Sequence, residues 1–142
     1  MSSRRNFIRN ASIAGMGLVA VPGFARNSFS AADKLNVGLI GVGLRGTNHL
    51  QNLLLRKDVN VTAICDVDPE RIAIAKKHIA EAKGKTPKVF GSNDLDYKNL
   101  LALADVDAVV IATPWLWHTR MTVDAMEAGK YAGVEVSASN TL

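Results

Sequence analysis

The sequence predicts an α/β domain built on a doubly wound parallel sheet, and two observations support this fold class. First, five predicted strands alternate with four segments whose apolar residues recur at helical spacing. Second, the connections are short, and strands that alternate with helices form parallel sheets with crossover helices. Ligands of such sheets gather at the carboxyl ends of the strands. The residues that follow each strand are therefore the first candidates for a site.

The first predicted strand, over residues 35–40, ends in a glycine-rich turn. Gly41, Gly43 and Gly46 follow in the spacing GxGxxG. In that spacing the first glycine permits a tight turn, the second lets the main chain approach a pyrophosphate, and the third allows close packing of the next helix. The turn predicts a dinucleotide site. The alternative is a βαβ unit without a ligand, in which the glycines only shape the turn.

An acidic residue stands where a dinucleotide site needs one. A helix predicted from Arg45 to Arg56 and a strand from Val59 to Cys65 lead to Asp66, about 20 positions after the last glycine. A carboxylate there accepts hydrogen bonds from both hydroxyls of the adenosine ribose and repels a 2′-phosphate. No arginine follows Asp66 directly, so the sequence favours NAD over NADP.

The other elements follow from capping residues and apolar spacing. A helix is expected to begin with Asp68 as N-cap and Pro69 at its first position and to be closed by Gly84. Another is expected from His118 to Ala128, closed by Gly129 in the left-handed conformation. The remaining predicted elements are the strands Lys88–Phe90, Asp107–Ala112 and Tyr131–Val136 and the helix Tyr97–Ala104. The inward residues of the two longer helices are predicted to be Ile72, Ala75, Ile79, Met121, Ala125 and Met126.

Two aromatic residues and a histidine follow the fourth strand, in residues 113–118, TPWLWH. Trp115 and Trp117 can stack on a nicotinamide or a sugar ring, or they can only cover apolar surface. His118 is predicted to open the next helix, where the positive helix end favours a neutral imidazole that can hydrogen-bond a ligand; it can equally be an ordinary helix residue. At the end of the fifth strand, Glu135 is predicted to contact ribose or nicotinamide, or to be a solvated carboxylate.

The distribution of charge excludes a nucleic-acid interface. The formal net charge is +4, but the first 32 residues hold Arg4, Arg5, Arg9 and Arg26 and no acidic residue. From Asp33 onward, 13 basic residues balance 13 acidic ones. No basic stripe remains to bind a phosphate backbone.

Residues 1–32 have the pattern of a twin-arginine export signal. The pair Arg4 and Arg5 precedes an apolar run over residues 11–21 that Pro22 closes. The run is too short for a membrane-anchoring helix across roughly 30 Å of bilayer, so we expect no stable anchor. We expect export to the periplasm or the extracellular space, with the mature chain beginning between residues 26 and 33. The single Cys65 cannot form an internal disulfide.

Taken in order, five segments resemble the Gfo/Idh/MocA oxidoreductase family and, within it, glycoside hydrolase family 109, exported bacterial α-N-acetylgalactosaminidases. These segments are GVGLRG at 41–46, Asp66, ATPWLWH at 112–118, AMEAGK at 125–130 and GVEVSASNTL at 133–142. The broad family has E-K-P after the fifth strand, with a lysine used in proton transfer. The EVS triplet at 135–137 agrees with family 109 instead.

The resemblance implies an NAD-binding, Rossmann-type domain over residues 33–142. It implies a carbohydrate substrate and glycosidic cleavage through transient oxidation at C3 and elimination, with NAD regenerated in each turnover. It implies no metal. The cofactor contacts that it implies, besides the three glycines, are Leu44, Arg45, Asp66, Trp115, Leu116, Trp117, His118, Glu135 and Val136.

Members of this family continue into a second, α+β domain that holds the substrate pocket, the acid/base groups and the usual oligomer interface. We therefore expect this chain to be the N-terminal part of such a protein and to lack catalysis alone. Two alternatives remain open: an NAD-dependent sugar dehydrogenase of the same superfamily, and a truncated, non-catalytic dinucleotide-binding remnant.

Overall fold

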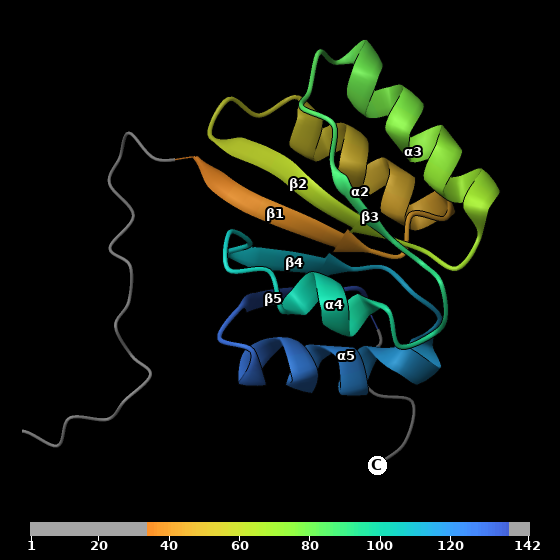
Figure 1. Cartoon of the computed structure of the whole chain (residues 1–142), viewed down its shortest axis with the longest axis vertical. Coiled ribbons are helices and arrows are strands. Elements are labelled where there is room, and N and C mark those ends of the chain that lie inside the picture. Colours follow the sequence, from red (N-terminus) through yellow and green to blue (C-terminus); the bar gives the residue numbers. More distant parts are fainter. Residues whose placement is uncertain (1–33, 137–142) are drawn as a thin grey trace, which may run out of the picture.

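The computed structural model describes residues 34–136, which form a five-stranded parallel sheet with helices on both faces (Figure 1). The strands lie in the order β3-β2-β1-β4-β5 and all pair in parallel. This confirms the predicted doubly wound sheet. The predicted leader, residues 1–32, and the last residues, 137–142, lie outside the described part. The strands are β1 (Leu35–Ile40), β2 (Val59–Cys65), β3 (Lys88–Phe90), β4 (Ala108–Ile111) and β5 (Tyr131–Val134), and the helices are α2 (Leu44–Leu54), α3 (Pro69–Glu81), α4 (Tyr97–Leu101) and α5 (Trp115–Glu127).

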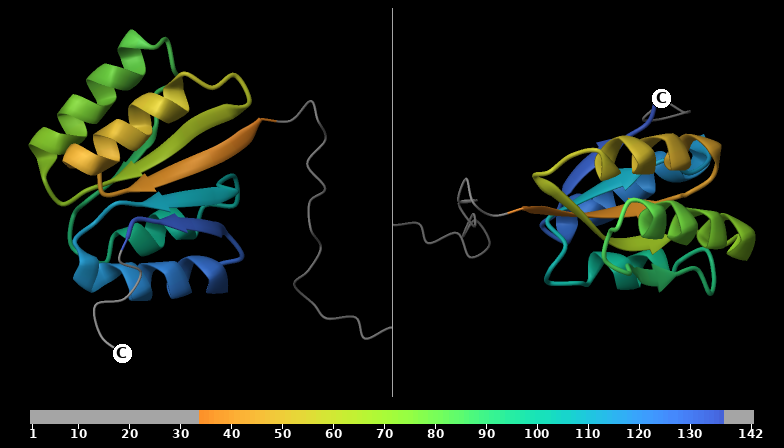
Figure 2. Two further views of the ribbon diagram at one scale, coloured as in Figure 1. Left: turned by 180° about the vertical axis from the view of Figure 1, so that it is seen from behind. Right: turned by 90° about the horizontal axis from the view of Figure 1, so that it is seen from above.

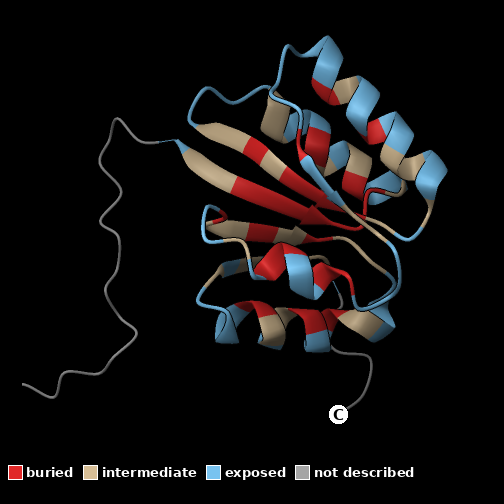
Figure 3. Ribbon diagram, viewed as in Figure 1, coloured by how far each residue is buried: buried red, intermediate tan, exposed pale blue. Residues whose placement is uncertain are grey.

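Two apolar layers hold the helices on the sheet. Leu39 of β1 belongs to the cluster that includes Leu50 of α2 and Ile79 of α3. The next residue, Ile40, belongs to the opposite cluster, which the helices α4 and α5 cover. Neighbouring residues of a strand point to opposite faces, so a sheet covered on both sides needs apolar residues at both sets of positions. Figure 2 shows α2 and α4 on opposite sides of the sheet, and Figure 3 shows the buried residues along β1 and on the inner sides of the helices.

The ends of α3 show how local sequence sets its length. Asp68 is the N-cap, and its carboxylate accepts hydrogen bonds from the backbone N–H groups of Glu70 and Arg71. Pro69 occupies the first helical position, as predicted. The predicted closing residue, Gly84, is part of the helix end, and the left-handed residue there is Lys83, with φ of 56°. Gly84 comes next and donates its N–H to the Ile79 carbonyl at 2.8 Å, which completes a Schellman-type end.

The start of α5 differs from the prediction. The helix begins at Trp115 rather than at His118, with Pro114 as its N-cap. The fixed φ of proline suits a helix start, so residues 115–118 form the first turn of the helix. The predicted cap at the other end is confirmed: Gly129 has φ of 73°, and the next residue donates its N–H to the Ala125 carbonyl.

One predicted core position on α5 is wrong. Met121 and Ala125 are buried, as predicted, but Met126 is 58% exposed. Residues four apart share a helix face, whereas successive residues are about 100° apart. Met126 therefore points away from the face that its neighbour presents to the sheet.

Smaller differences concern element ends. The helix α2 ends at Leu54 rather than Arg56, and α4 ends at Leu101 rather than Ala104. The strands β4 and β5 are shorter than predicted. None of the helices within residues 34–136 is long and apolar enough to cross a membrane.

Polar contacts fix the segments that enter β4 and β5. The carboxylate of Asp107 accepts the N–H of Asn36 at 2.9 Å, which joins the starts of β4 and β1. The ammonium of Lys130 donates to the carbonyls of Leu103 and Val106, each at 2.7 Å. Both carbonyls belong to the loop between α4 and β4 and lie beyond the end of the helix. Lys130 therefore supplies hydrogen bonds to a loop that has no regular structure of its own.

We expect Asp68→Ala to lower the free energy of unfolding by about 1 kcal/mol, because it removes the side-chain acceptor at the start of α3. Urea denaturation of the two proteins measures this. Asp68→Asn is the matched control and should retain most of the stability, since its amide oxygen can accept the same bonds. Equal losses in the two variants would contradict the capping role.

Candidate functional site

A cavity of about 230 Å³ lies at the carboxyl edge of the sheet. It opens where β1, β2 and β4 end, which is where the sequence predicts a ligand. Its floor is apolar, and polar groups stand around it. The residues that line it include Gly41, Gly43, Asp66, Asn93, Asp94, Thr113 and Trp117.

The three glycines have three different physical roles. Gly41 has φ of 87°, and a Cβ there would lie 2.8 Å from the backbone of Ala112. A Cβ on Gly46 would collide with the Gly41 carbonyl oxygen, so the first turn of α2 packs directly on the glycine turn. A Cβ on Gly43 would meet no atom of the described residues within 4 Å. Its bare backbone therefore faces open space at the mouth of α2, where a phosphate group can approach.

The start of α2 is suited to an anion. Gly43 is the N-cap, no side chain caps the helix, and its first turn holds no acidic residue. The first N–H groups of a helix have no partner within the helix, and its dipole favours negative charge there. These features match the site that a pyrophosphate occupies in dinucleotide-binding domains.

The carboxylate of Asp66 joins the glycine turn to the end of β2. Its Oδ2 accepts the N–H of Val42 at 2.7 Å, and its Oδ1 accepts the N–H of Asp68 at 3.0 Å. Each oxygen has a second lone pair, so Asp66 can accept further hydrogen bonds from a ligand in the cavity that it lines.

A second aspartate shapes the loop after β3. Asp96 is only 8% exposed, and it accepts the N–H groups of Gly91 and Ser92 at 2.6 and 2.8 Å. Its other oxygen accepts the amide of Asn99 at 2.7 Å. These bonds, that of the Ser92 N–H foremost, hold the pKa of Asp96 far below its ordinary value. The loop that presents Asn93 to the cavity is thus built around a carboxylate that is ionised at neutral pH.

The segment TPWLWH places its residues in different environments. Trp117 lines the cavity, and the guanidinium of Arg120 lies 5.7 Å from its ring centroid. Trp115 and Leu116 are exposed, at 63% and 75%. His118 is fully buried, and its Nε2 lies 2.8 Å from the Thr113 carbonyl oxygen. In this structure the imidazole supports the end of β4 and does not line the cavity, and its contact with a cofactor stays a prediction.

The residues after β5 lie beside the start of α2. Glu135 accepts hydrogen bonds through Oε1 from Arg45 Nε at 3.0 Å and from His49 Nε2 at 2.5 Å. The predicted contact residues Arg45 and Glu135 are therefore bonded to each other. Leu44 and Val136 are exposed, at 79% and 80%.

Two candidate reactive groups of the cavity are neutral. Burial raises the pKa of the Cys65 thiol to about 12, and Asp96 and Asp66 add to the effect. Burial and the hydrogen bond to Asp124 raise the pKa of Tyr97 to about 12. Neither group is a nucleophile or a base near pH 7. Within residues 34–136, no three His, Cys, Asp or Glu side chains are placed to hold a metal ion.

Several of these residues were not predicted from the sequence. The rule that strand ends meet at one edge applies to β3 as well, and it would have pointed to Asn93 and Asp94. His49 lies one turn after Arg45 on α2, but nothing in the sequence connects it with Glu135.

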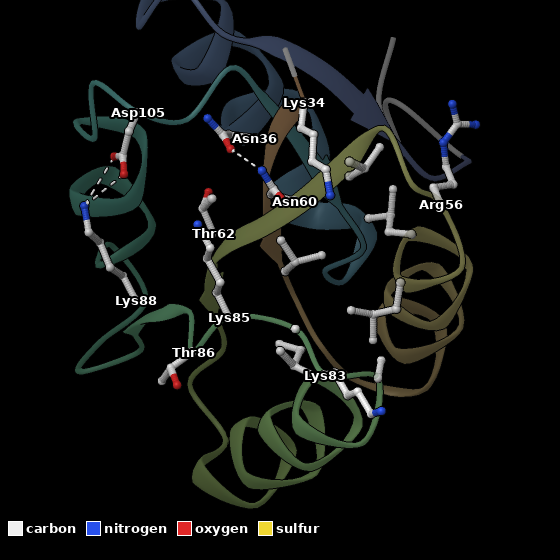
Figure 4. Close-up of a pocket in the computed structure, with 17 residues that line it drawn as sticks. Lys34, Asn36, Arg56, Asn60, Thr62, Lys83, Lys85, Thr86, Lys88 and Asp105 are labelled. Atoms are coloured by element: carbon white, nitrogen blue, oxygen red, sulfur yellow. Dashed lines mark hydrogen bonds and ion pairs between the residues drawn. The ribbon is translucent and has the colours of Figure 1, made fainter. Parts of the chain in front are cut away.

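A larger hollow, of about 550 Å³, opens at the opposite edge of the sheet, beside the ends of α2 and α3 (Figure 4). Lys83 and Lys85 lie on its rim, and Lys88 forms an ion pair with Asp105 at 3.3 Å. No predicted site residue lines it. Because parallel α/β sheets bind ligands at their carboxyl ends, we assign the site to the smaller cavity.

Comparison with known proteins identifies the family of this chain. The model of the oxidoreductase family with an NAD-binding Rossmann fold, Gfo/Idh/MocA, matches residues 35–136. This chain belongs to that family. The match spans the whole described sheet, and it confirms the family that the sequence resembles.

Curated relatives confirm the resemblance to glycoside hydrolase family 109. A glycosyl hydrolase family 109 protein from Parabacteroides distasonis is 38% identical, over 99% of this chain and 34% of its own length. The α-N-acetylgalactosaminidase of Shewanella oneidensis is 36% identical, over 98% of this chain and 34% of its own length. The chain thus spans about a third of the length of the curated relatives it matches.

Solved structures share the fold. The scyllo-inositol dehydrogenase of Lactobacillus casei, with bound NAD(H) and scyllo-inositol, superposes with a TM-score of 0.65 at 26% identity, over 75% of this chain and 29% of that one. A 3-ketoreductase from Actinomadura kijaniata, in complex with NADP and TDP-benzene, has a TM-score of 0.61 at 27% identity, over 75% of this chain and 30% of that one.

We expect Gly46→Ala to lower the free energy of unfolding by about 1 to 3 kcal/mol, because the new methyl group collides with the Gly41 carbonyl. Gly43→Ala is the matched control: its methyl group meets open space, so its effect should stay within about 1 kcal/mol. Urea denaturation compares the two. Similar losses would show that the close contact between the turn and α2 is not the reason for glycine at position 46.

We also expect stability to fall as the pH drops below about 4, the ordinary pKa of aspartate in an unfolded chain. The folded-state pKa of Asp96 is lowered, so its stabilising effect is complete above that pH and is lost as protons bind. In Asp96→Asn this part of the pH dependence should disappear. Unfolding measured between pH 7 and pH 2 tests this, and an unchanged profile in the variant would contradict it.

Proposed function

We propose that this domain binds NAD along the carboxyl edge of its sheet. The glycine turn and the start of α2 would hold the pyrophosphate, and Asp66 would accept hydrogen bonds from the adenosine ribose. The observation that carries the proposal is the bare backbone at Gly43 beside an uncapped helix start. Membership of an NAD-binding family supports it.

The charge around the cavity favours NAD over NADP. Among residues 34–136, the charged residues that line it are Asp66 and Asp94, and no lysine or arginine does so. A 2′-phosphate on the adenosine ribose would meet a carboxylate there with no cation to balance it. Among the similar solved structures, one holds NAD(H) and another holds NADP, so the choice proposed for this chain rests on these local charges.

We propose that the protein to which this domain belongs is a glycosidase like its family 109 relatives, with an α-N-acetylgalactosaminide as substrate. The relatives' names and the EVS triplet at 135–137 support this. NAD would supply reversible hydride transfer at a sugar carbon. The part of this chain is to bind and orient the cofactor, since Cys65 and Tyr97 are held in their neutral forms.

A second candidate is an NAD-dependent dehydrogenase of a sugar or a polyol, which the likeness to scyllo-inositol dehydrogenase supports. The two reactions differ in their net use of NAD. A glycosidase of this kind returns the hydride and accumulates no NADH, whereas a dehydrogenase accumulates one NADH for each substrate oxidised. The non-catalytic alternative predicts NAD binding and neither product.

These alternatives are tested on a full-length protein that contains this chain and is as long as the curated relatives. Incubation with a chromogenic α-N-acetylgalactosaminide should release the chromophore while absorbance at 340 nm stays constant. Accumulation of NADH with sugars or inositols, without release of the chromophore, would replace the glycosidase by the dehydrogenase.

We further propose that residues 1–32 direct export by the twin-arginine route. That route carries folded proteins, which suits a domain that binds its cofactor before transport. A fusion of residues 1–32 to a reporter should reach the periplasm, and a fusion in which Lys replaces both Arg4 and Arg5 should not.

For Asp66→Ala we expect NAD binding to weaken by about 10- to 150-fold, because a hydrogen bond to a charged group contributes about 1.5 to 3 kcal/mol. Loss of the contacts to Val42 and Asp68 would weaken NAD and NADP alike, so the informative quantity is the ratio of their two Kd values. Titration calorimetry should show this ratio moving toward NADP. Asp58→Ala, an exposed carboxylate at the opposite edge, is the control and should leave it unchanged. An unchanged ratio in Asp66→Ala would contradict the ribose role.

A further inference from the structure

Three side chains from two distant parts of the sequence meet beside the start of α2. Arg45 and His49 lie one turn apart on this helix, and Glu135 follows β5. Oε1 of Glu135 accepts from Arg45 Nε at 3.0 Å and lies 2.5 Å from His49 Nε2. The contacts span 90 and 86 residues of sequence. They join α2, the helix that follows the glycine turn, to the end of β5, which is an edge strand of the sheet.

The two contacts on Glu135 differ in strength. The side chain of Arg45 is 66% exposed, and exposed ion pairs contribute little. The side chains of His49 and Glu135 are only 33% and 18% exposed, and their contact is shorter. His49 is therefore the residue that fixes the position of the Glu135 carboxylate.

Both donors use the same carboxylate oxygen. Within residues 34–136, no hydrogen bond to Oε2 of Glu135 accompanies the two that Oε1 accepts. The hydrogen bond from His49 is the largest cause of the lowered pKa of Glu135, and the charge of Arg45 adds to it. The carboxylate is thus ionised and is anchored through Oε1. Its other oxygen, Oε2, is left to accept a hydrogen bond.

The strand order places Glu135 opposite Asp66 across the glycine turn. Asp66 follows β2, on one side of β1, and Glu135 follows β5, on the other side of β1 and β4. A dinucleotide lies across this crevice with its pyrophosphate at the glycine turn. If its adenosine ribose is at Asp66, its nicotinamide ribose lies on the side of Glu135.

We propose that His49 is a positioning residue of the cofactor site: it holds Oε1 of Glu135 so that Oε2 accepts a hydrogen bond from a hydroxyl of the nicotinamide ribose. This inference rests on the proposed binding of NAD. It assigns a role in cofactor binding to a residue that does not itself touch the cofactor.

The first test is a double-mutant cycle on NAD affinity, measured by calorimetry with the 142-residue chain. His49→Leu removes the donor, and Glu135→Gln removes the charge of the acceptor. Each should weaken NAD binding about tenfold. In the Glu135→Gln background, His49→Leu should weaken it no further, because His49 acts through Glu135. His49→Gln supplies an amide donor near the place of Nε2 and should recover most of the affinity.

A pH profile separates this role from a merely structural one. NAD affinity should fall as acid protonates Glu135, and in His49→Leu this acid limb should move to higher pH, because the bond that lowers the pKa of Glu135 is gone. Asp66 is unchanged in all of these variants. His78→Leu, a histidine on α3 that lies 3.7 Å from Glu81, is the control and should change neither affinity nor profile.

The outcomes are distinct. If the unchanged chain binds no NAD, the proposed function fails. If it binds NAD and His49→Leu has the same affinity and acid limb, the inference about His49 is wrong. Additive losses in the cycle would also overturn it. Should His49→Leu fail to fold, as circular dichroism would reveal, Glu135→Gln and His49→Gln decide: the inference requires a loss in the first and near-normal affinity in the second.

Discussion

The cofactor edge of this domain depends on the carboxylate of Asp66. It bonds the N–H of Val42 in the glycine turn and that of Asp68 at the start of α3. A single side chain therefore fixes the end of β2 and the turn after β1 relative to each other. The close contacts of Gly41 with Ala112 and of Gly46 with the turn then place β4 and α2 around the same point. The walls of the cavity are thus held in place by contacts within the chain.

The two edges of the sheet differ in charge, and this difference limits which groups at the carboxyl edge could attract an anionic ligand. Lysines gather at the amino edge, around the larger hollow, whereas the cavity at the carboxyl edge is lined by Asp66 and Asp94. In the proposed complex with NAD, the backbone N–H groups and the dipole at the start of α2 would attract the pyrophosphate. Such groups carry no formal charge. In the same proposed complex, Asp66 and Asp94 would disfavour a 2′-phosphate on the adenosine ribose.

The sequence predicted what local spacing determines and missed what packing determines. Glycine spacing and the position of Asp66 identified the turn and the strand that follows, because a βαβ unit brings them together over 24 residues. The start of α5 was predicted at His118, three residues too late, since Pro114 sets the helix start. The contact of His49 with Glu135 spans 86 residues. No periodicity encodes such a contact, because it arises only when β5 is placed beside β4.

The pairing of β1 with β4 has a consequence for how the chain folds. The contact between Asn36 and Asp107 closes a loop of 71 residues, far longer than the connection between β1 and β2. Long loops lose more entropy on closure, so local pairings form more readily than distant ones. We expect the glycine turn and Asp66 to assemble early, as one half of the cleft. We expect β4, β5 and the helix α5, which carries Trp117, to join the sheet later. The cavity would then be complete only when these last elements have joined.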